Sequence, residues 1–208
     1  MIMNKIFFIT GIGTGIGKTI VSAILTEKLQ ADYWKPIQSG DLDISDSLLV
    51  KNLVSNTKTM IHPEGYRLGQ PLSPHLSARL DGIEIKITEM PLPQTDNYLV
   101  VEGAGGLMVP LNDNQLILDL IKQLKARTIV VSQNYLGSIN HTLLTLEVLK
   151  HNRIPVEGLI FNGSPNAESE SYIKQYSDTK IIGRIPSLTT IDKENVKKAG
   201  HYLDLKVD

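Results

Sequence analysis

The sequence contains no cysteine, few aromatic residues and no excess of either charge. Without cysteine the chain can form no disulfide, no thiolate nucleophile and no cysteine-ligated metal site. A formal net charge of −1 gives no reason to expect nucleic acid or an anionic membrane surface as a partner. No apolar stretch approaches 18 residues, so we expect no membrane span. Lys5 precedes an apolar run of only four residues, which indicates no signal peptide, and we expect a cytoplasmic protein.

The composition that remains is that of an ordinary globular protein. The 208 residues are 41% apolar and 21% charged, which predicts one domain over residues 1–208 with ample length for a core. Short apolar runs alternate with helical patterns, which favours an α/β fold whose mostly parallel sheet carries helices on both faces. We predict strands at 6–9, 31–37, 98–101, 128–132, 156–161 and 180–183. We predict helices at 20–30, 44–54, 76–80, 116–125, 139–150, 167–177 and 192–203, with Ser45 and Ser138 as N-caps.

Two segments give a weaker pattern. Residues 62–75 contain three prolines and are predicted to form a loop that leads into the short helix at 76–80. Residues 85–96 have two prolines and little periodicity, so they favour no element.

The first strand runs directly into the glycine-rich segment GIGTGIGKT at residues 11–19, which is followed by a helical pattern. A strand, a glycine-rich loop, Gly-Lys-Thr and a helix in this order are typical of a phosphate-binding P-loop. In such a loop backbone N–H groups converge on phosphates, and the helix N-terminus adds partial positive charge. Lys18 would place its charge near the β- and γ-phosphates, and the Thr19 hydroxyl would bind Mg²⁺.

The spacing of this motif is unusual. The common pattern has a glycine five residues before Gly17, where this chain has Ile12. Only a count from Gly11, which adds one residue, restores the pattern. The alternative interpretation is a simple glycine-rich turn, but the strand and helix on either side favour a P-loop.

Further polar or glycine-rich segments follow the other predicted strands. They are KPIQSG (35–40), EGAGG (102–106), NYLGS (134–138) and Asn162–Gly163. Because ligands of parallel α/β sheets gather at the carboxyl ends of the strands, we expect these segments to line the same edge as the P-loop. Together with the P-loop motif, the position of these segments predicts an NTP-binding protein.

Each candidate in these segments also has a simpler interpretation. Glu102 resembles the Mg²⁺-associated acid of P-loop enzymes, or it is a surface acid before a flexible turn. Lys35 would neutralise charge on a transferring phosphoryl group, or it is a solvated lysine at a strand end. Asp46 is favoured early in a helix by the helix dipole, whether or not it contacts Mg²⁺. Asn162 with the following glycine reads a base edge or forms only a turn.

The five histidines show no metal-ligand spacing. We interpret His62, His151 and His201 as surface or packing residues.

Eight segments together resemble the dethiobiotin synthetase family. They occur in the family's order through nearly the whole chain: ITGIGTGIGKT (9–19), WKPIQSG (34–40), Asp46, PLSPHLSA (71–78), VVEGAGGLMVPL (100–111), LGSINH (136–141), GLIFN (158–162) and IIGRIPSL (181–188). Each segment alone is a weak signal, whereas the ordered set is highly specific.

The resemblance implies an ATP- and Mg²⁺-dependent ligase with a homodimeric P-loop fold. It implies 7,8-diaminononanoate, CO₂ or bicarbonate, and ATP as substrates, and dethiobiotin, ADP and phosphate as products. In that chemistry one amine captures CO₂ as a carbamate, which ATP phosphorylates to a mixed anhydride. The second amine then displaces phosphate and closes the ureido ring.

The resemblance also implies a role for each matching residue. Lys18 and Lys35 are the implied catalytic cations, and Thr19, Asp46 and Glu102 are the implied metal ligands. Ser39 is implied to contact the diamine or its carbamate. Substrate-carboxylate binding across the dimer interface is implied for Gly137, Ser138, Ile139 and Asn140, where a helix N-terminus suits an anion. Nucleotide contacts are implied for Gly15, Ile16, Gly17, Lys18, Thr19, Ile20, Asp46, Glu102, Gly103, Ala104, Gly105, Asn162, Gly163, Pro186, Ser187 and Leu188.

This chain departs from the family pattern at three points. Gly13 and Gly15 stand where many members carry Asp and Glu, and the segment between Ser39 and Asp46 is short. The first two bear on the preference for ATP over CTP or GTP, which the sequence leaves open. It also leaves open whether Asp192 or Glu194 binds the ribose.

Three alternative functions remain to be weighed. A ParA/MinD-type switch ATPase carries a lysine early in its loop, where this chain has Gly13. An amidotransferase-type ligase of cobalamin synthesis needs a nucleophilic cysteine, which this chain lacks. A non-catalytic nucleotide-binding module would have no need for both lysines and Glu102.

Overall fold

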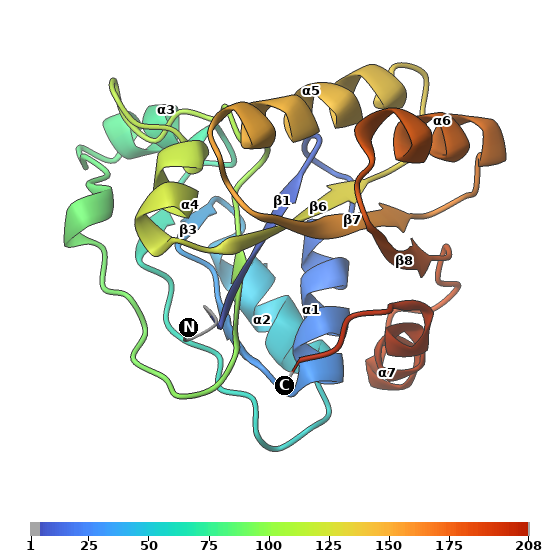
Figure 1. The fold of residues 1–208 in the computed structure, drawn as a ribbon. Helices are drawn as coiled ribbons and strands as arrows, with labels where there is room; N and C mark the ends of the chain where they lie inside the picture. Colours follow the sequence, from blue (N-terminus) through green and yellow to red (C-terminus); the bar gives the residue numbers. More distant parts are fainter. Residues whose placement is uncertain (1–4, 208) are drawn as a thin grey trace.

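A six-stranded parallel sheet forms the centre of the computed structural model, which describes residues 5–207 (Figure 1). The strand order is β2-β5-β1-β6-β7-β8, and every neighbouring pair is parallel. The strands are β1 Ile6–Gly11, β2 Asp32–Trp34, β5 Leu99–Glu102, β6 Arg127–Ser132, β7 Val156–Asn162 and β8 Ile181–Ile185. The predicted α/β class with a mostly parallel sheet is therefore confirmed.

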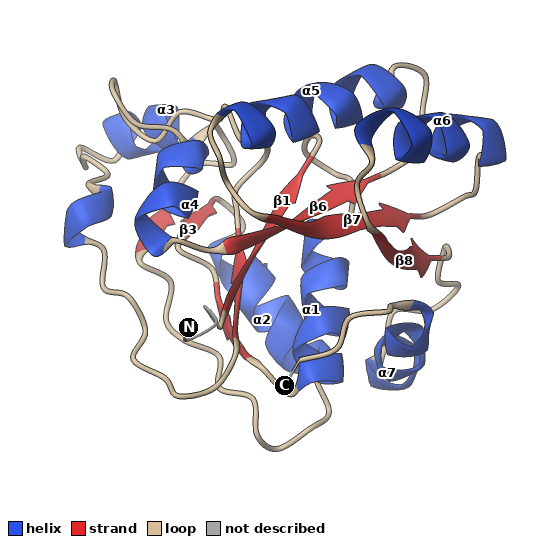
Figure 2. Cartoon of the chain, viewed as in Figure 1, coloured by secondary structure: helices blue, strands red, loops and turns tan. Residues whose placement is uncertain are grey.

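Helices cover both faces of this sheet (Figure 2). Side chains alternate along a strand, so Phe7 and Ile9 of β1 pack on one face and Phe8 packs on the other. The first face is covered by α1 Lys18–Leu29, α2 Asp46–Leu53 and α7 Lys193–Ala199. The second face is covered by α3 Pro74–Leu80, α4 Ile117–Leu124, α5 Ser138–His151 and α6 Ala167–Ser177. Because both faces are buried, the central strands are nearly continuous apolar runs.

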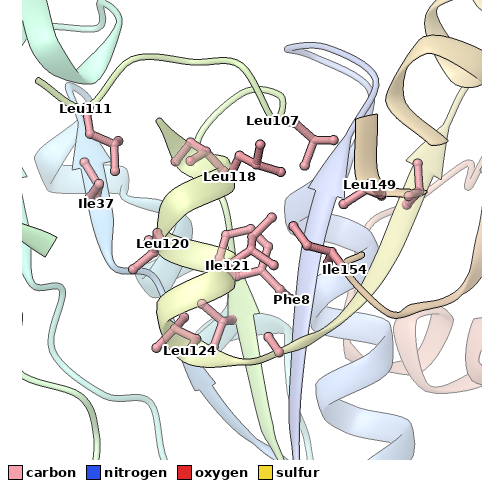
Figure 3. Packing of buried hydrophobic residues seen from close by; sticks show 14 of the residues in the cluster. Phe8, Ile37, Leu107, Leu111, Leu118, Leu120, Ile121, Leu124, Leu149 and Ile154 are labelled. Carbon is pink, nitrogen blue, oxygen red and sulfur yellow. The ribbon is translucent and has the colours of Figure 1, made fainter. Parts of the chain in front are cut away.

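The packing of α4 shows how helical spacing builds the second face (Figure 3). Leu118, Ile121 and Leu124 recur every three residues and are buried in the same cluster as Phe8. Burial of one such side chain stabilises the fold by about 1.5–3 kcal/mol. Truncation of the fully buried Phe8 to alanine would also leave a cavity and would cost about 3–5 kcal/mol.

The segment after β2 differs from the prediction of one strand over 31–37. The main-sheet strand ends at Trp34, and the chain then enters a separate strand, β3 Ile37–Ser39. This strand pairs in parallel with β4 Tyr66–Leu68, inside the segment that we predicted as a loop. Strands of three residues are too short to give a period-two pattern, so only the fold reveals them.

Helix ends were predicted with mixed success. Ser45 is the N-cap of α2, where its hydroxyl accepts the N–H of Leu48, as predicted. The predicted cap at Ser138 is wrong: Gly137, with φ 101°, is the N-cap of α5, and Ser138 is its first residue. The last helix is shorter than predicted, because a 3₁₀ turn at Gly200–Tyr202 follows α7. Short 3₁₀ turns also occur at Leu42–Ile44 and Ile87–Glu89.

Within residues 5–207, no helix combines the length and apolar character needed to cross a membrane.

Candidate active site

The glycine-rich loop connects the end of β1 to the start of α1. Gly15 has φ 75° and Gly17 has φ 87°, in the left-handed region that favours glycine. Gly17 is the N-cap of α1, and the helix begins at Lys18. The backbone N–H groups at this end of α1 have no helical partner, so the geometry suits an anion.

A residue far away in the sequence contacts this loop. Asn162, at the end of β7, donates its Nδ2 group to the carbonyl oxygen of Ile16 at 2.8 Å. A Cβ atom on Gly17 would lie only 2.2 Å from that same nitrogen. Gly17 therefore serves two purposes, because its φ angle and the closeness of Asn162 both disfavour a side chain. The predicted adenine contact of Asn162 stays a prediction.

Three oxygen-bearing side chains converge in front of the loop. The Thr19 hydroxyl lies 2.8 Å from Asp46 Oδ1 and 2.9 Å from Glu102 Oε1. Thr19 lies in the first turn of α1, Asp46 opens α2, and Glu102 ends β5, so the three residues come from separate elements at one edge of the sheet. The structure thus brings together the set that we predicted as metal ligands.

Lys35 lies between the same two carboxylates. Its Nζ atom is 2.6 Å from Asp46 Oδ2, 3.1 Å from Glu102 Oε1 and 3.3 Å from the carbonyl oxygen of Gly103. Lys35 is 4% exposed and Glu102 is 1% exposed. The solvated-lysine interpretation of Lys35 is therefore wrong, and so is the surface-acid interpretation of Glu102.

These contacts shift the acidity of the buried groups. Burial by itself would lower the pKa of Lys35, but the charges of Glu102 and Asp46 outweigh it and raise that pKa. Burial by itself would raise the pKa of Asp46, but the positive charge of Lys35 outweighs it and lowers that pKa. Lys35 is therefore a cation and Asp46 an anion near neutral pH.

Lys18 has a different environment. Its Nζ atom donates to the carbonyl oxygen of Gly13 at 2.9 Å, within the loop itself. Burial lowers the pKa of Lys18 to about 8, with the positive charge of Lys35 adding to this effect and Glu102 and Asp46 opposing it. A phosphate group beside this lysine would favour its charged form.

Tyr33 is a site residue that sequence reasoning missed. It is fully buried, and its hydroxyl donates to Glu102 Oε2 at 2.8 Å. Burial raises the pKa of Tyr33 well above its ordinary value, with the negative charges of Glu102 and Asp46 adding to this effect, so the phenol stays protonated. The only sequence signal was its place two residues before Lys35 in a strand, which puts both side chains on one face.

The donor set fits Mg²⁺. Mg²⁺ binds oxygen ligands and is usually held by one or two carboxylates together with water and substrate phosphates. Thr19, Asp46 and Glu102 supply one hydroxyl and two carboxylates beside a phosphate-binding loop. Within the described chain, 5–207, no group of three or more His, Cys, Asp or Glu side chains forms a metal cage of its own.

The glycines after Glu102 lie against β1. The N–H group of Gly103 donates to the carbonyl oxygen of Ile9 at 3.0 Å, and a Cβ atom there would meet the Phe8 ring at 2.7 Å. Gly105 has φ 67°. These two positions need glycine for packing and for backbone conformation, while their nucleotide contacts, and that of Ala104, stay predictions.

Two further segments of the predicted site lie at the same edge of the sheet. The Ser39 hydroxyl oxygen, in β3, is buried and finds no hydrogen-bond partner among residues 5–207. Gly137, Ser138, Ile139 and Asn140 form the first turn of α5, which follows β6, and Ser138 is buried there. A buried hydroxyl without a partner usually has a ligand or water in the working protein, so Ser39 fits a substrate contact.

The segment after β8 contains the remaining candidates. Gly163 has φ 93°, and a Cβ atom there would lie 3.9 Å from the Ser187 hydroxyl, so the two predicted base-binding segments lie close together. Asp192 caps α7 by accepting the N–H of Asn195 at 2.8 Å. Glu194 pairs with Lys198 on the same helix. Asp192 and Glu194 thus both have partners within α7. These contacts do not identify either acid as a ribose ligand.

Sequence comparisons place these residues in a known context. A protein-family model described as an AAA domain matches residues 5–195. The chain is 50% identical over 196 residues to the ATP-dependent dethiobiotin synthetase BioD of Christiangramia forsetii, covering 94% of each chain. It is 46% identical over 194 residues to the protein of the same name from Brucella ovis, covering 93% of this chain and 92% of the relative.

Comparisons of structure agree on the fold. The cell division ATPase MinD of Pyrococcus furiosus matches with a TM-score of 0.59 and 14% identity, covering 96% of this chain and 98% of that one. MinD of Pyrococcus horikoshii, solved with Mg-ADP, matches with a TM-score of 0.56 and 15% identity, covering 93% and 85%. At this identity the likeness concerns the fold alone.

Proposed function

The chain belongs to the ATP-dependent dethiobiotin synthetase family, and from this membership we propose which of its residues carry out the reaction. It is an ATP-dependent ligase that forms dethiobiotin in biotin biosynthesis. The observation that supports the assignment of residues is the convergence of Thr19, Lys35, Asp46 and Glu102 in front of the P-loop.

The nucleotide phosphates bind to the loop from Gly15 to Ile20. The backbone N–H groups at the start of α1 donate to phosphate oxygens, and the helix dipole favours their negative charge. Lys18 turns from the Gly13 carbonyl oxygen to the phosphates, where its ammonium group neutralises charge that builds up during transfer. The base and ribose would contact Asn162, Gly163 and the backbone of Pro186–Leu188, and Gly103–Gly105 would add further nucleotide contacts.

Two amines of 7,8-diaminononanoate are joined through one carbon of CO₂. The first amine attacks CO₂, loses a proton and becomes a carbamate. A carbamate oxygen then attacks the γ-phosphorus of ATP, the bond to ADP breaks, and a carbamic-phosphoric anhydride forms. The second amine attacks the carbonyl carbon, phosphate leaves with the bonding electron pair, and a proton is released as the ring closes.

Lys35 stabilises the negative charge that develops during these reaction steps. Its ammonium group is buried and stays protonated beside the carboxylates, so it offers a fixed positive charge in a water-poor place. There it stabilises the carbamate and the transferring phosphoryl group more than it would in water. Ser39 offers its buried hydroxyl, which has no partner within the described part of the chain, to the diamine or its carbamate.

Mg²⁺ is held by Thr19, Asp46 and Glu102. At that position the ion would supply positive charge that offsets the negative charge of the phosphates during transfer. The two carboxylates also form ion pairs with Lys35 and compensate its positive charge.

The substrate carboxylate binds to the first turn of α5, at Gly137–Asn140. This 14-residue helix carries a partial positive charge at that end, where the Ser138 N–H donates to the carbonyl oxygen of Tyr135 at 2.9 Å. We propose that the substrate reaches this turn across the interface of a homodimer.

Two further proposals concern the whole chain. Residues 1–208 form one domain, and the enzyme works in the cytoplasm.

A switch ATPase of the ParA or MinD type is the second candidate, because those proteins share the fold. Two observations count against this candidate. Gly13 stands where that class carries its loop lysine, and the relatives at 46–50% identity are named dethiobiotin synthetases.

The test is phosphate release from Mg-ATP in the presence of bicarbonate, with and without 7,8-diaminononanoate. We expect release only with the diamine, matched by dethiobiotin in the mass spectrum. Release that does not depend on the diamine would contradict the proposal and favour the switch ATPase. The same assay with CTP and GTP measures which nucleotide is preferred.

A further inference from the structure

Tyr33 is a buried tyrosine that touches the candidate metal site without being one of its ligands. Its hydroxyl donates to Glu102 Oε2 at 2.8 Å. The other carboxylate oxygen, Oε1, lies 2.9 Å from the Thr19 hydroxyl and 3.1 Å from Lys35 Nζ. The two oxygens of Glu102 therefore have separate partners, and only Oε1 faces the other groups of the site.

The register of the sheet explains how Tyr33 reaches this position. Tyr33 on β2 is paired with Val100 on β5, and Glu102 lies two residues after Val100. Side chains two residues apart on a strand share a face, so Tyr33, Val100 and Glu102 all face α1. The phenol spans the diagonal between the two strands, a separation within reach of aromatic and other long side chains.

We propose that Tyr33 is a positioning residue that occupies Glu102 Oε2 and leaves Oε1 as the single oxygen of Glu102 available to a metal ion. This inference rests on the proposed function, because it takes Thr19, Asp46 and Glu102 as the metal ligands. Mg²⁺ demands near-octahedral geometry with few protein ligands, whereas Ca²⁺ accepts six to eight oxygens and bidentate carboxylates. A carboxylate restricted to one oxygen therefore favours Mg²⁺ over Ca²⁺.

A purely structural role for Tyr33 makes a different prediction. A buried tyrosine normally finds a hydrogen-bond partner, and a carboxylate of the neighbouring strand is a suitable one. In that case loss of the hydroxyl would lower stability but would leave the preference between metal ions unchanged. Ion preference is thus the measurement that separates the two roles.

The experiment compares Tyr33→Phe with Tyr98→Phe. Tyr98 lies just before β5, stacks on Phe7 with ring centroids 6.0 Å apart, and packs against the same apolar cluster as Tyr33. Mn²⁺ binding to each protein with excess ADP is measured from the electron paramagnetic resonance signal of free Mn²⁺. Mg²⁺ and Ca²⁺ are then titrated as competitors, and thermal unfolding is recorded for each variant.

We expect Tyr33→Phe to weaken Mg²⁺ competition about tenfold, in line with the loss of an outer partner of a metal ligand, and to leave Ca²⁺ competition nearly unchanged. The ratio of Mg²⁺ to Ca²⁺ affinity then falls about tenfold, while Tyr98→Phe keeps the wild-type ratio. An unchanged ratio in Tyr33→Phe, with both variants destabilised to a similar extent, would overturn the proposal.

A second measurement needs no variant and so does not depend on folding of Tyr33→Phe. Infrared spectra of the unmodified protein with ¹³C-labelled glutamate carboxylates are recorded as Mg²⁺ is added with ADP. We expect the wide separation of the two carboxylate stretching bands that marks ligation through one oxygen. A narrowed separation, which marks ligation through both oxygens, would contradict the role of Tyr33.

Failure of this inference can be told apart from failure of the proposed function. An unmodified protein in which Mg²⁺ does not compete with Mn²⁺ would contradict the metal assignment and the role of Tyr33 together. A protein that shows the expected ion preference but forms no dethiobiotin from the diamine would contradict the proposed function alone.

Discussion

Two carboxylates of β2 and β5 are almost fully buried, and they lie at opposite ends of neighbouring strands. Glu102 ends β5 and is 1% exposed, and Asp32 begins β2 and is 4% exposed. Each accepts several hydrogen bonds, yet the donors differ in kind. Glu102 is bound by a lysine, a threonine of the P-loop and a tyrosine, all at the carboxyl edge of the sheet.

Asp32 is bound by groups that come from two loops. It accepts the N–H of Met60 at 3.0 Å, the Thr95 hydroxyl at 2.7 Å and the Asn97 amide at 3.2 Å, and it lies 3.1 Å from His62 Nε2. These contacts join segments 60–62 and 95–97 to the start of β2. Burial and hydrogen bonding alone thus do not identify a functional acid, whereas the groups gathered around it and the edge of the sheet do.

Replacement of Lys18 by alanine tests the Glu102 side of this comparison most strongly. We expect kcat/KM for ATP to fall about 10³-fold, because phosphates lose a charge that is needed in binding and in transfer. Lys18→Arg, which keeps the charge, is the control and should retain part of the activity. Steady-state phosphate release measures both variants, and near-normal turnover in Lys18→Ala would refute the P-loop assignment.

Lys35→Ala separates turnover from binding. We expect kcat to fall about 10²-fold, since the charge of Lys35 is proposed to act on the carbamate and the transferring phosphoryl group. The dissociation constant of Mg-ADP should change little, as measured by calorimetry. Lys51→Ala, at an exposed lysine of α2, should match the wild type. A variant that binds nucleotide weakly but turns over normally would reverse this assignment.

Glu102→Gln keeps the shape of the side chain and removes its charge. We expect the Mg²⁺ concentration for half-maximal activity to rise about tenfold or more, because a metal ligand is weakened. Glu27→Gln is the matched control, because Glu27 is also buried but, within residues 5–207, its carboxylate is bound by Ser55 and Asn56 and by no group of the site. An Mg²⁺ titration that is the same in Glu102→Gln and wild type would remove Glu102 from the metal site.

Asp32→Ala tests the other side of the comparison. It leaves several buried donors without an acceptor, so we expect the free energy of unfolding to fall by about 2–3 kcal/mol in urea denaturation. Turnover per folded molecule should stay at the wild-type value at low temperature. A loss of kcat in fully folded protein would mean that the two ends of the sheet are coupled.

The smallest effect concerns acid stability. Burial by itself would raise the pKa of Asp32, but hydrogen bonds from Met60, Thr95, His62 and Asn97 outweigh it and lower that pKa. The stabilisation is therefore fully present above the pKa of the unfolded chain and is lost as pH falls through the lower folded value. We expect the free energy of unfolding to decline below about pH 4, and less steeply in Asp32→Asn. If the free energy of unfolding declines with falling pH equally in wild type and Asp32→Asn, Asp32 contributes nothing to acid unfolding.

Predictions from sequence succeeded where a residue sits at the end of a clear strand. Glu102 follows three buried apolar residues, and the rule for parallel sheets placed it beside Thr19 and Lys35, as the structure does. The partners of Asp32 could not be predicted, because Met60 and Asn97 lie in loops with no period. The contact of Tyr33 with Glu102 could not be predicted either, since an aromatic residue in a strand has the pattern of a core residue.

The sequence by itself determined the α/β class, the P-loop between β1 and α1, and the edge of the sheet where the site lies. These features depend on apolar runs, glycine positions and the direction of parallel strands, which are local properties of the chain. Only the tertiary structure decided that β3 leaves the main sheet, that Asn162 contacts the loop at Ile16, and that Tyr33 takes one oxygen of Glu102. Each of these joins residues at least 29 positions apart in the sequence, and no short pattern encodes such contacts.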